Sequence, residues 1–141
     1  MRNLILFLLP AITFAQTSVE LKQSDYDEAL SFTNLVRSYY GYNYLNYDDN
    51  LSDRAVEAAV YFMENDGNID DRNVLFFQTS KYEGADVSVY IADAVVAWAV
   101  DDQFGYRIQT LKQIVDEQNY SIAFGVVQTD DAVCVTAKFN E

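Results

Sequence analysis

The stretch that decides the fold is residues 121–139, which read SIAFGVVQTDDAVCVTAKF. Two runs rich in Val, Ala and Phe, 121–129 and 132–139, flank the pair Asp130 and Asp131. Valine and phenylalanine favour strands, and aspartate is a common turn residue. The stretch therefore predicts an antiparallel β-hairpin near the C-terminal end of the chain.

The segments before the hairpin show mainly the apolar spacing of helices, three or four residues apart. Helices are expected over 24–40, 51–65 and 88–103, with a short one over 108–117. Gly41 is expected to end the first of them. The residues expected to face the core are Ala29, Leu30, Phe32, Leu35 and Val36 in the first helix, Leu51, Ala55, Ala58, Ala59 and Phe62 in the second, and Ile91, Val95 and Trp98 in the third. Residues 74–77 predict a strand, and 42–49 a connecting loop. This order of elements predicts an α+β fold.

The N-terminal end has the order of a secretory signal peptide. One positive charge at Arg2 precedes the apolar run Leu4–Leu9, and the small residue Ala15 follows. The run is shorter than the roughly 20 residues that a membrane-spanning helix needs, and no later stretch is long enough. We therefore expect a signal peptide at 1–15, one secreted domain at 16–141 and no transmembrane segment.

The chain is strongly acidic, with a formal net charge of −13. Removal of residues 1–15 takes away Arg2, one positive charge, and leaves −14. Such a surface repels nucleic acid, so no nucleic-acid partner is expected. It is compatible with a basic partner, or it is simply a solvated acidic surface.

Histidine is absent and Cys134 is the only cysteine. No disulfide within the chain is possible, and the apolar neighbours of Cys134 predict a buried thiol. A serine or cysteine nucleophile would lack an imidazole base. Glycosylation sequons occur at Asn50 and Asn119.

Several short motifs, in order, resemble the CAP superfamily of cysteine-rich secretory proteins, venom antigens and plant pathogenesis-related proteins. The resemblance covers about residues 25–139. It is carried by Asn34-Leu35-Val36-Arg37, Gly41, Leu45-Asn46-Tyr47-Asp48, Leu51, Ala55, Ala59, Val95, Trp98, Tyr106, Gln113-Ile114-Val115, Gly125 and Val133-Cys134. It implies an α-β-α sandwich with a small antiparallel sheet between helices.

The resemblance also implies a cleft, which typical members line with two histidines and two acidic residues, some of them binding a divalent metal. Here the matching positions are Thr33 and Thr110 in place of histidine, with Glu83 and Asp101 as the acidic pair. Zinc prefers nitrogen and sulfur ligands, so this set predicts no zinc site and no cofactor. The carboxylates could attract calcium, or they could bond Arg37, Thr33 and Thr110 and hold helices in place.

The segment Tyr39–Tyr47 is unusually aromatic, with Tyr40, Tyr42 and Tyr44 at alternate positions. Tyrosines make contact surfaces for proteins or sugars, but they also tie loops to a core. The leading hypothesis is a secreted, non-catalytic CAP-like domain that binds an extracellular protein, glycan or small ligand through this segment and the cleft. One alternative is a carboxylate-based or calcium-dependent hydrolase that uses Glu83 and Asp101. Another is a structural component of an extracellular assembly that dimerises through Cys134.

Overall fold

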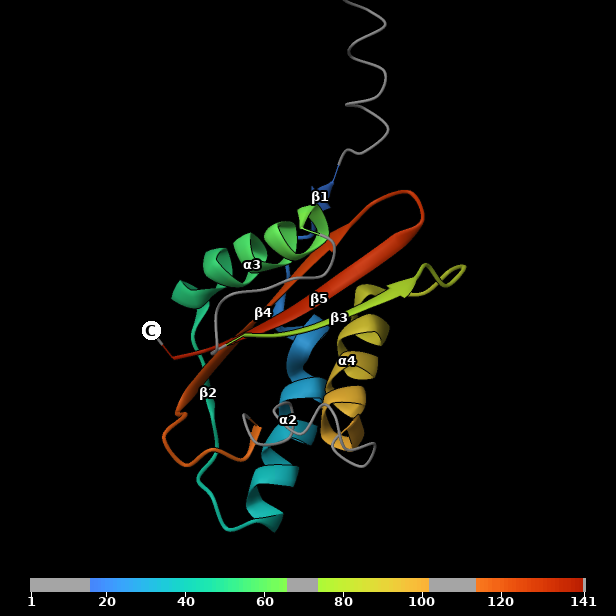
Figure 1. Cartoon of the computed structure of the whole chain (residues 1–141). Helices are drawn as coiled ribbons and strands as arrows, with labels where there is room; N and C mark the ends of the chain where they lie inside the picture. The colour runs from blue at the N-terminus through green and yellow to red at the C-terminus, as the bar shows by residue number, and fades with distance from the viewer. Residues whose placement is uncertain (1–15, 66–73, 102–113, 141) are drawn as a thin grey trace, which may run out of the picture.

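The computed structural model describes residues 16–65, 74–101 and 114–140. Its strands form one sheet with helices on both faces (Figure 1). Helix α3 packs on one face, against β4 and β5, while α2 and α4 pack together on the other. Within the described ranges, no helix has both the length and the apolar character needed to cross a membrane.

The elements follow one another in the order helix, helix, strand, helix and hairpin, with two very short strands added. Their bounds are β1 (Thr17–Ser18), α2 (Gln23–Tyr39), β2 (Asn46–Tyr47), the 3-10 helix η1 (Asp49–Leu51), α3 (Ser52–Glu64), β3 (Val74–Ser80), α4 (Val87–Asp101), β4 (Ser121–Gln128) and β5 (Ala132–Phe139).

Local signals in the sequence set both ends of α2. At its start, the Asp25 carboxylate accepts the backbone N–H of Lys22 at 2.8 Å, which satisfies a donor that the helix leaves free. At its end, Gly41 adopts φ +85°, a conformation that favours glycine, and the N–H of Tyr42 returns to the carbonyl of Arg37. The chain therefore leaves the helix in a fixed direction.

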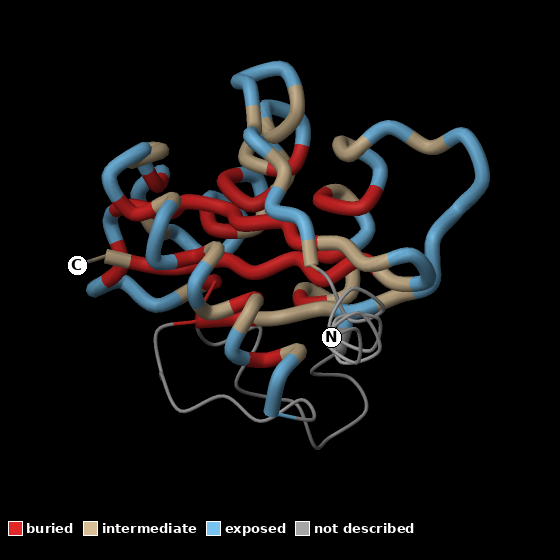
Figure 2. The backbone as a smooth tube through the Cα atoms, turned by 90° about the horizontal axis from the view of Figure 1, so that it is seen from above, coloured by how far each residue is buried: buried red, intermediate tan, exposed pale blue. Residues whose placement is uncertain are grey.

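The predicted hairpin forms the centre of the sheet, whose strand order is β1-β4-β5-β3. In the hairpin Gly125 pairs with Thr136 and Val127 with Cys134. Nearly every residue of β4 and β5 is buried, which Figure 2 shows as two continuous buried runs between the outer elements. Because helices cover both faces, most residues of these strands are apolar on both faces of the sheet, and Ser121, Thr136 and Lys138 are the buried polar exceptions.

Helix α3 approaches the sheet most closely at Gly125. A Cβ built there would lie 2.6 Å from the carbonyl carbon of Ala55 and 2.6 Å from the nitrogen of Val56. Beside this contact, the Thr136 hydroxyl donates a hydrogen bond to the carbonyl of Ala55. Glycine is thus required by the direct contact between the backbones of α3 and β4.

The helices predicted over 24–40, 51–65 and 88–103 and the strands predicted over 74–77, 121–129 and 132–139 are confirmed in type, and the α+β class is confirmed. One core assignment is wrong: Leu35 is 65 % exposed, because no described element covers that side of α2. The predicted loop 42–49 contains β2, which pairs in parallel with β4, and β1 was not predicted. The predicted helix over 108–117 lies largely outside the described residues.

Cys134 is fully buried beneath α3, in a cluster with Ala59, Phe62 and Val127. Burial raises the pKa of its thiol to about 12. The prediction of a buried thiol is therefore confirmed. Dimerisation through Cys134 would require the buried sulfur to reach a second chain, and it stays a prediction.

Replacement of Gly125 by alanine should destabilise the fold, because α3 must move away from β4. We expect a loss of about 2 kcal/mol or more in the free energy of unfolding, measured by urea denaturation. Gly84→Ala is the control: its φ is +73° but nothing lies within 4 Å of the added Cβ, so only backbone strain is expected. A loss at Gly125 no larger than the loss at Gly84 would contradict the close contact.

The thiol of Cys134 should not react with Ellman's reagent at pH 8 in the native protein. It should react fully once urea unfolds the chain, because burial keeps the reactive thiolate scarce and inaccessible. Rapid modification of the native protein, or a dimer band on a gel that reduction removes, would show that the sulfur reaches the surface.

Candidate binding surface and the family cleft

The side chain of Asn34 holds the loop that follows α2. Its amide donates to the carbonyl of Leu45 at 3.2 Å, and its oxygen accepts the N–H of Leu45 at 2.7 Å. The Asn34 amide thus bonds both backbone groups of Leu45, as a neighbouring strand would, and Asn34 and Leu45 are both buried. The loop is therefore fixed against the helix just before β2 begins.

One turn later, Arg37 is 1 % exposed, and its guanidinium donates to four backbone carbonyls. The acceptors are Asn43 at 2.6 Å, Ile114 at 2.7 Å, Asp116 at 2.9 Å and Asn119 at 3.0 Å. The first lies in the loop after α2, and the other three precede β4. A single side chain thus joins three parts of the chain.

Burial lowers the pKa of Arg37, while the nearby Asp116 and Tyr42 oppose that change. The guanidinium carbon lies 5.8 Å from the centre of the Tyr42 ring, within the range of a cation–π contact. Tyr42 is half-buried. Its ring therefore contacts the side chain that holds the loop, and the binding role predicted for Tyr42 stays a prediction.

The neighbouring tyrosines point outward. Tyr40 is 51 % exposed and Tyr44 is 65 % exposed, and Tyr39, which was not among the predicted contact residues, is 85 % exposed. The rings of Tyr39 and Tyr40 meet edge to face, with centroids 5.4 Å apart. Tyr39 and Tyr40 lie at the C-terminal end of α2, and Tyr44 lies in the loop that follows it. We call Tyr39, Tyr40 and Tyr44 the tyrosine surface.

A shallow groove of about 580 Å³ runs along α2 beside this surface. Leu30, Phe32, Leu35 and Tyr44 contribute its apolar wall, and Asp27 and Glu28 line it with carboxylates. The exposed side of Leu35 is thus continuous with Tyr44.

The four residues of the implied cleft are only partly described. Thr33 is buried in α2, and its hydroxyl donates to the carbonyl of Ala29 at 2.8 Å. Glu83 is exposed in the turn between β3 and α4. Asp101 is the last residue of α4, but its side chain lies outside the description, as does Thr110. The convergence of these four on one cleft stays a prediction.

The donor set does not fit a zinc site. The sequence offers no histidine, and its one cysteine is buried beneath α3. In the part of the chain that the structure describes, no three acidic or cysteine side chains come together to hold an ion. Arg37, which could have paired with Glu83 or Asp101, bonds carbonyls instead.

The two sequons differ in exposure. Asn50 is exposed in η1, whereas Asn119 is 7 % exposed and its side-chain oxygen accepts a bond from Asn140 at 3.0 Å. A glycan on Asn119 would disrupt this packing, so Asn50 remains the candidate that the fold accommodates.

The described residues form an α-β-α sandwich, with α3 on one face of a mostly antiparallel sheet and α2 and α4 on the other. Residues 30–139 match the family model of the CAP, or cysteine-rich secretory protein, family. The chain therefore belongs to the CAP family, and the resemblance seen in its sequence is confirmed. Among curated proteins, none matches this sequence.

Several solved structures share the fold. The hookworm platelet inhibitor has a TM-score of 0.71 at 10 % identity, over 92 % of this chain and 75 % of its own. NaASP2, crystallised with Zn²⁺, has a TM-score of 0.67 at 12 % identity, and the match covers 85 % of this chain and 80 % of NaASP2. An outer surface protein from Borrelia burgdorferi has a TM-score of 0.54 at 17 % identity, and the match covers 90 % of this chain and 100 % of that protein. At such identities the likeness shows the fold alone.

Replacement of Arg37 by lysine should destabilise the protein although it keeps the charge. A lysine ammonium cannot reach four carbonyls, and each carbonyl left buried without a donor costs about 1–3 kcal/mol. We expect the free energy of unfolding to fall by about 3 kcal/mol in urea denaturation. Arg54→Lys, on the exposed side of α3, is the matched control and should change little. Equal effects of the two substitutions would contradict the role given to Arg37.

Proposed function

We propose that this chain is a secreted CAP domain that binds an extracellular partner through the tyrosine surface, without catalysing a reaction. The observation that carries the proposal is the exposure of Tyr39, Tyr40 and Tyr44 beside a backbone that Asn34 and Arg37 hold rigidly. The partner is a protein, a glycan or a small ligand.

A fixed loop favours binding because little conformational freedom is lost when the complex forms. Tyrosine has only two flexible torsions, and it offers a large apolar ring with a hydroxyl at its tip. The helix end and the clamped loop present three such rings, next to the apolar groove of Leu35 and Phe32. Exposed aromatic surface of this kind is typical of interaction sites.

Secretion is supported by the signal-peptide pattern of residues 1–15 and by the family. Two of the similar structures carry names that fit proteins acting outside a cell, a platelet inhibitor and an outer surface protein.

A non-catalytic role agrees with the general character of the family, whose members are mostly not enzymes. Thr33 supports it as well, because its hydroxyl is already bonded inside α2 and the chain has no imidazole to serve as its base. Nothing supports the alternative of a hydrolase that uses Glu83 and Asp101, and Glu83 lies exposed in a turn.

The tyrosine surface can be tested with arrays of glycans and of extracellular proteins. Wild-type protein should bind at least one array ligand, and the triple variant Tyr39→Ala, Tyr40→Ala, Tyr44→Ala should bind it at least about tenfold more weakly, since aromatic anchors dominate such interfaces. Affinity is then measured by calorimetry with the ligand found.

Tyr61→Ala provides the matched control, since Tyr61 is 48 % exposed but lies on α3, across the sheet. It should bind like wild type. Two outcomes would reject the proposal: unchanged affinity in the triple variant, or no array ligand bound by wild type at micromolar concentration.

A further inference from the structure

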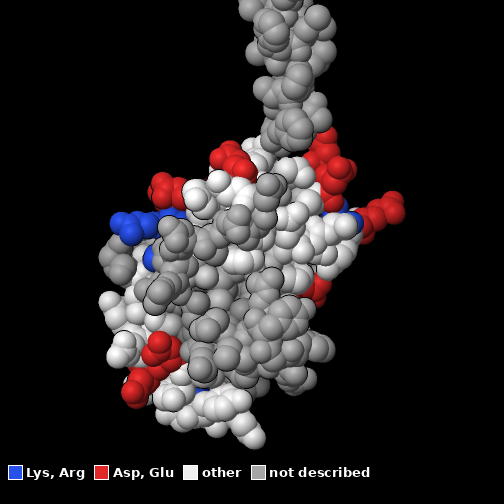
Figure 3. Space-filling model, viewed as in Figure 1, with Lys and Arg blue, Asp and Glu red and all other residues white. Residues whose placement is uncertain are grey.

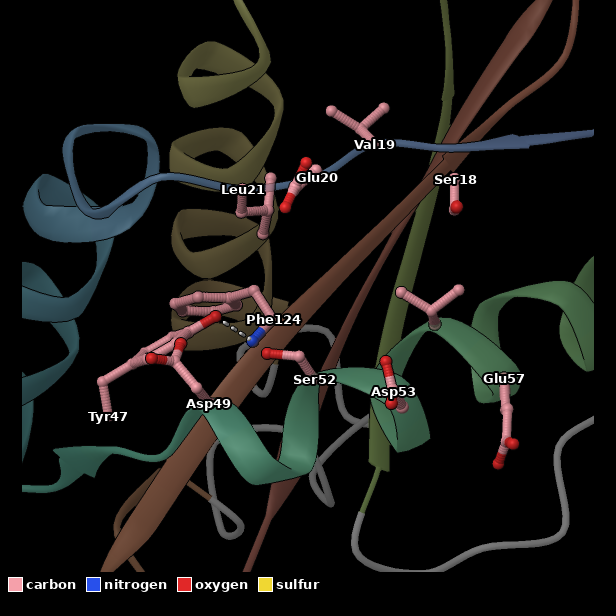
Figure 4. Close-up of a pocket in the computed structure, with 11 residues that line it drawn as sticks. Ser18, Val19, Glu20, Leu21, Tyr47, Asp49, Ser52, Asp53, Glu57 and Phe124 are labelled. Atoms are coloured by element: carbon pink, nitrogen blue, oxygen red, sulfur yellow. Dashed lines mark hydrogen bonds between the residues drawn. The ribbon is translucent and has the colours of Figure 1, made fainter.

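A second depression lies far from the tyrosine surface, beside the edge of β4. Its volume is about 730 Å³. Figure 4 shows its walls: the chain from Ser18 to Leu21 on one side, η1 and the start of α3 on the other, and Phe124 of β4 between them. We call it the edge groove. It was not predicted, because its walls come from three distant segments of the sequence.

The groove exists because two short strands share one edge of β4 without meeting. β1 pairs with Val127 and Gln128, and β2 pairs with Ser121 and Ile122. Between them, the chain after Tyr47 turns away into η1 instead of continuing along β4. The Tyr47 phenol oxygen accepts the N–H of Phe124 at 3.0 Å, in place of a backbone carbonyl (Figure 4). The middle of this edge is thus covered by a side chain and not by a strand.

Four carboxylates line this space: Glu20, Asp49, Asp53 and Glu57. No lysine or arginine is among the described residues that line it. Asp53 and Glu57 lie four apart on α3, a spacing at which like charges repel each other and destabilise a helix. Figure 3 shows acidic side chains at several places on the face that it draws, and the formal net charge of −13 attracts a cation toward the protein.

The groove also offers apolar and aromatic surface. The ring of Tyr47 stacks on Tyr26 with centroids 3.6 Å apart, which fixes its position beside Phe124 and Val56. Burial raises the pKa of Tyr47 to about 12, so the phenol stays neutral at physiological pH. Aromatic faces attract ammonium and guanidinium groups, and carboxylates next to them strengthen that attraction.

A bare metal ion does not suit this arrangement. Among the described residues, no three carboxylates converge closely enough to hold one. The charges are spread along the walls, and the volume falls in the range typical of sites for organic ligands, roughly 300–1,000 Å³. A ligand that fits the groove must therefore be an organic molecule that carries several positive charges and also has apolar groups.

We infer that the edge groove binds a short basic peptide segment of a partner protein, with lysine or arginine side chains toward the four carboxylates and apolar side chains toward Phe124 and Val56. Charge complementarity selects the sign of the partner, and the apolar floor selects a peptide over a simple polyamine. The groove is independent of the tyrosine surface, so this inference does not rest on the proposed function.

The test uses a fluorescent peptide of alternating lysine and valine, with the acidic peptide of alternating glutamate and valine for comparison. The basic peptide should bind the wild-type domain and the acidic one should not, and binding should weaken as salt rises. In NMR spectra the amide signals of Val56 and Phe124 should shift. Binding no tighter than about 1 mM, or shifts confined to other residues, would overturn the inference.

Two double variants with the same change in charge locate the site. Asp53→Asn with Glu57→Gln should weaken binding at least about tenfold, because two partners of the peptide's cations are lost. Asp93→Asn with Glu117→Gln removes two exposed carboxylates outside the groove and should weaken binding less than about twofold. Equal losses would show attraction to overall charge only. Spermine binding as tightly as the peptide would overturn the choice of a peptide.

Discussion

The buried charge of Arg37 is the constraint on which the arrangement of the other segments depends. A guanidinium out of contact with water is costly unless hydrogen-bond acceptors replace the water, and here backbone carbonyls accept four of its five N–H donors. The carbonyl dipoles stabilise the arginine, and the nearby Asp116 favours its charged form as well. The cost of burial can be recovered only if residues 43 and 114–119 are in place together. Arg37 therefore couples the loop after α2 to the chain that enters β4.

That coupling explains the unusual edge of the sheet. The loop held by Asn34 and Arg37 delivers β2 to β4 in parallel, and the segment held by the same arginine delivers β4 itself. β2 ends after two residues because the chain must turn into η1 and then α3, which crosses the opposite face at Gly125. The tight contact at Gly125 and the part of the β4 edge at Phe124 that no strand covers thus both result from the course of the chain from β2 through η1 to α3. Both follow from where Arg37 fixes the loop.

The local sequence signal was sufficient for the long elements and insufficient for the short ones. Helices of thirteen residues or more carry enough apolar positions to show a period, and the eight-residue strands are recognisable by their Val, Ala and Phe content. β1 and β2 have two residues each, and such strands have no period to detect. Leu35 fits the apolar stripe of α2, yet it is exposed, because spacing shows which residues share a face and not whether another element covers it.

The candidate sites were predictable only where one segment contains the whole site. The aromatic composition of 39–47 pointed to the tyrosine surface, although exposure divides its members differently: Tyr42 supports Arg37 while Tyr39 faces solvent. The edge groove combines residues 18–21, 47–57 and 124, and no local pattern connects them. In a CAP fold without histidine, the candidate surfaces for recognition are therefore the tyrosine surface at the end of α2 and the edge groove beside β4. The loop end is held by bonds from the side chains of Asn34 and Arg37 to backbone carbonyls. The exposed tyrosine side chains are therefore free to differ from those of relatives without loss of the fold.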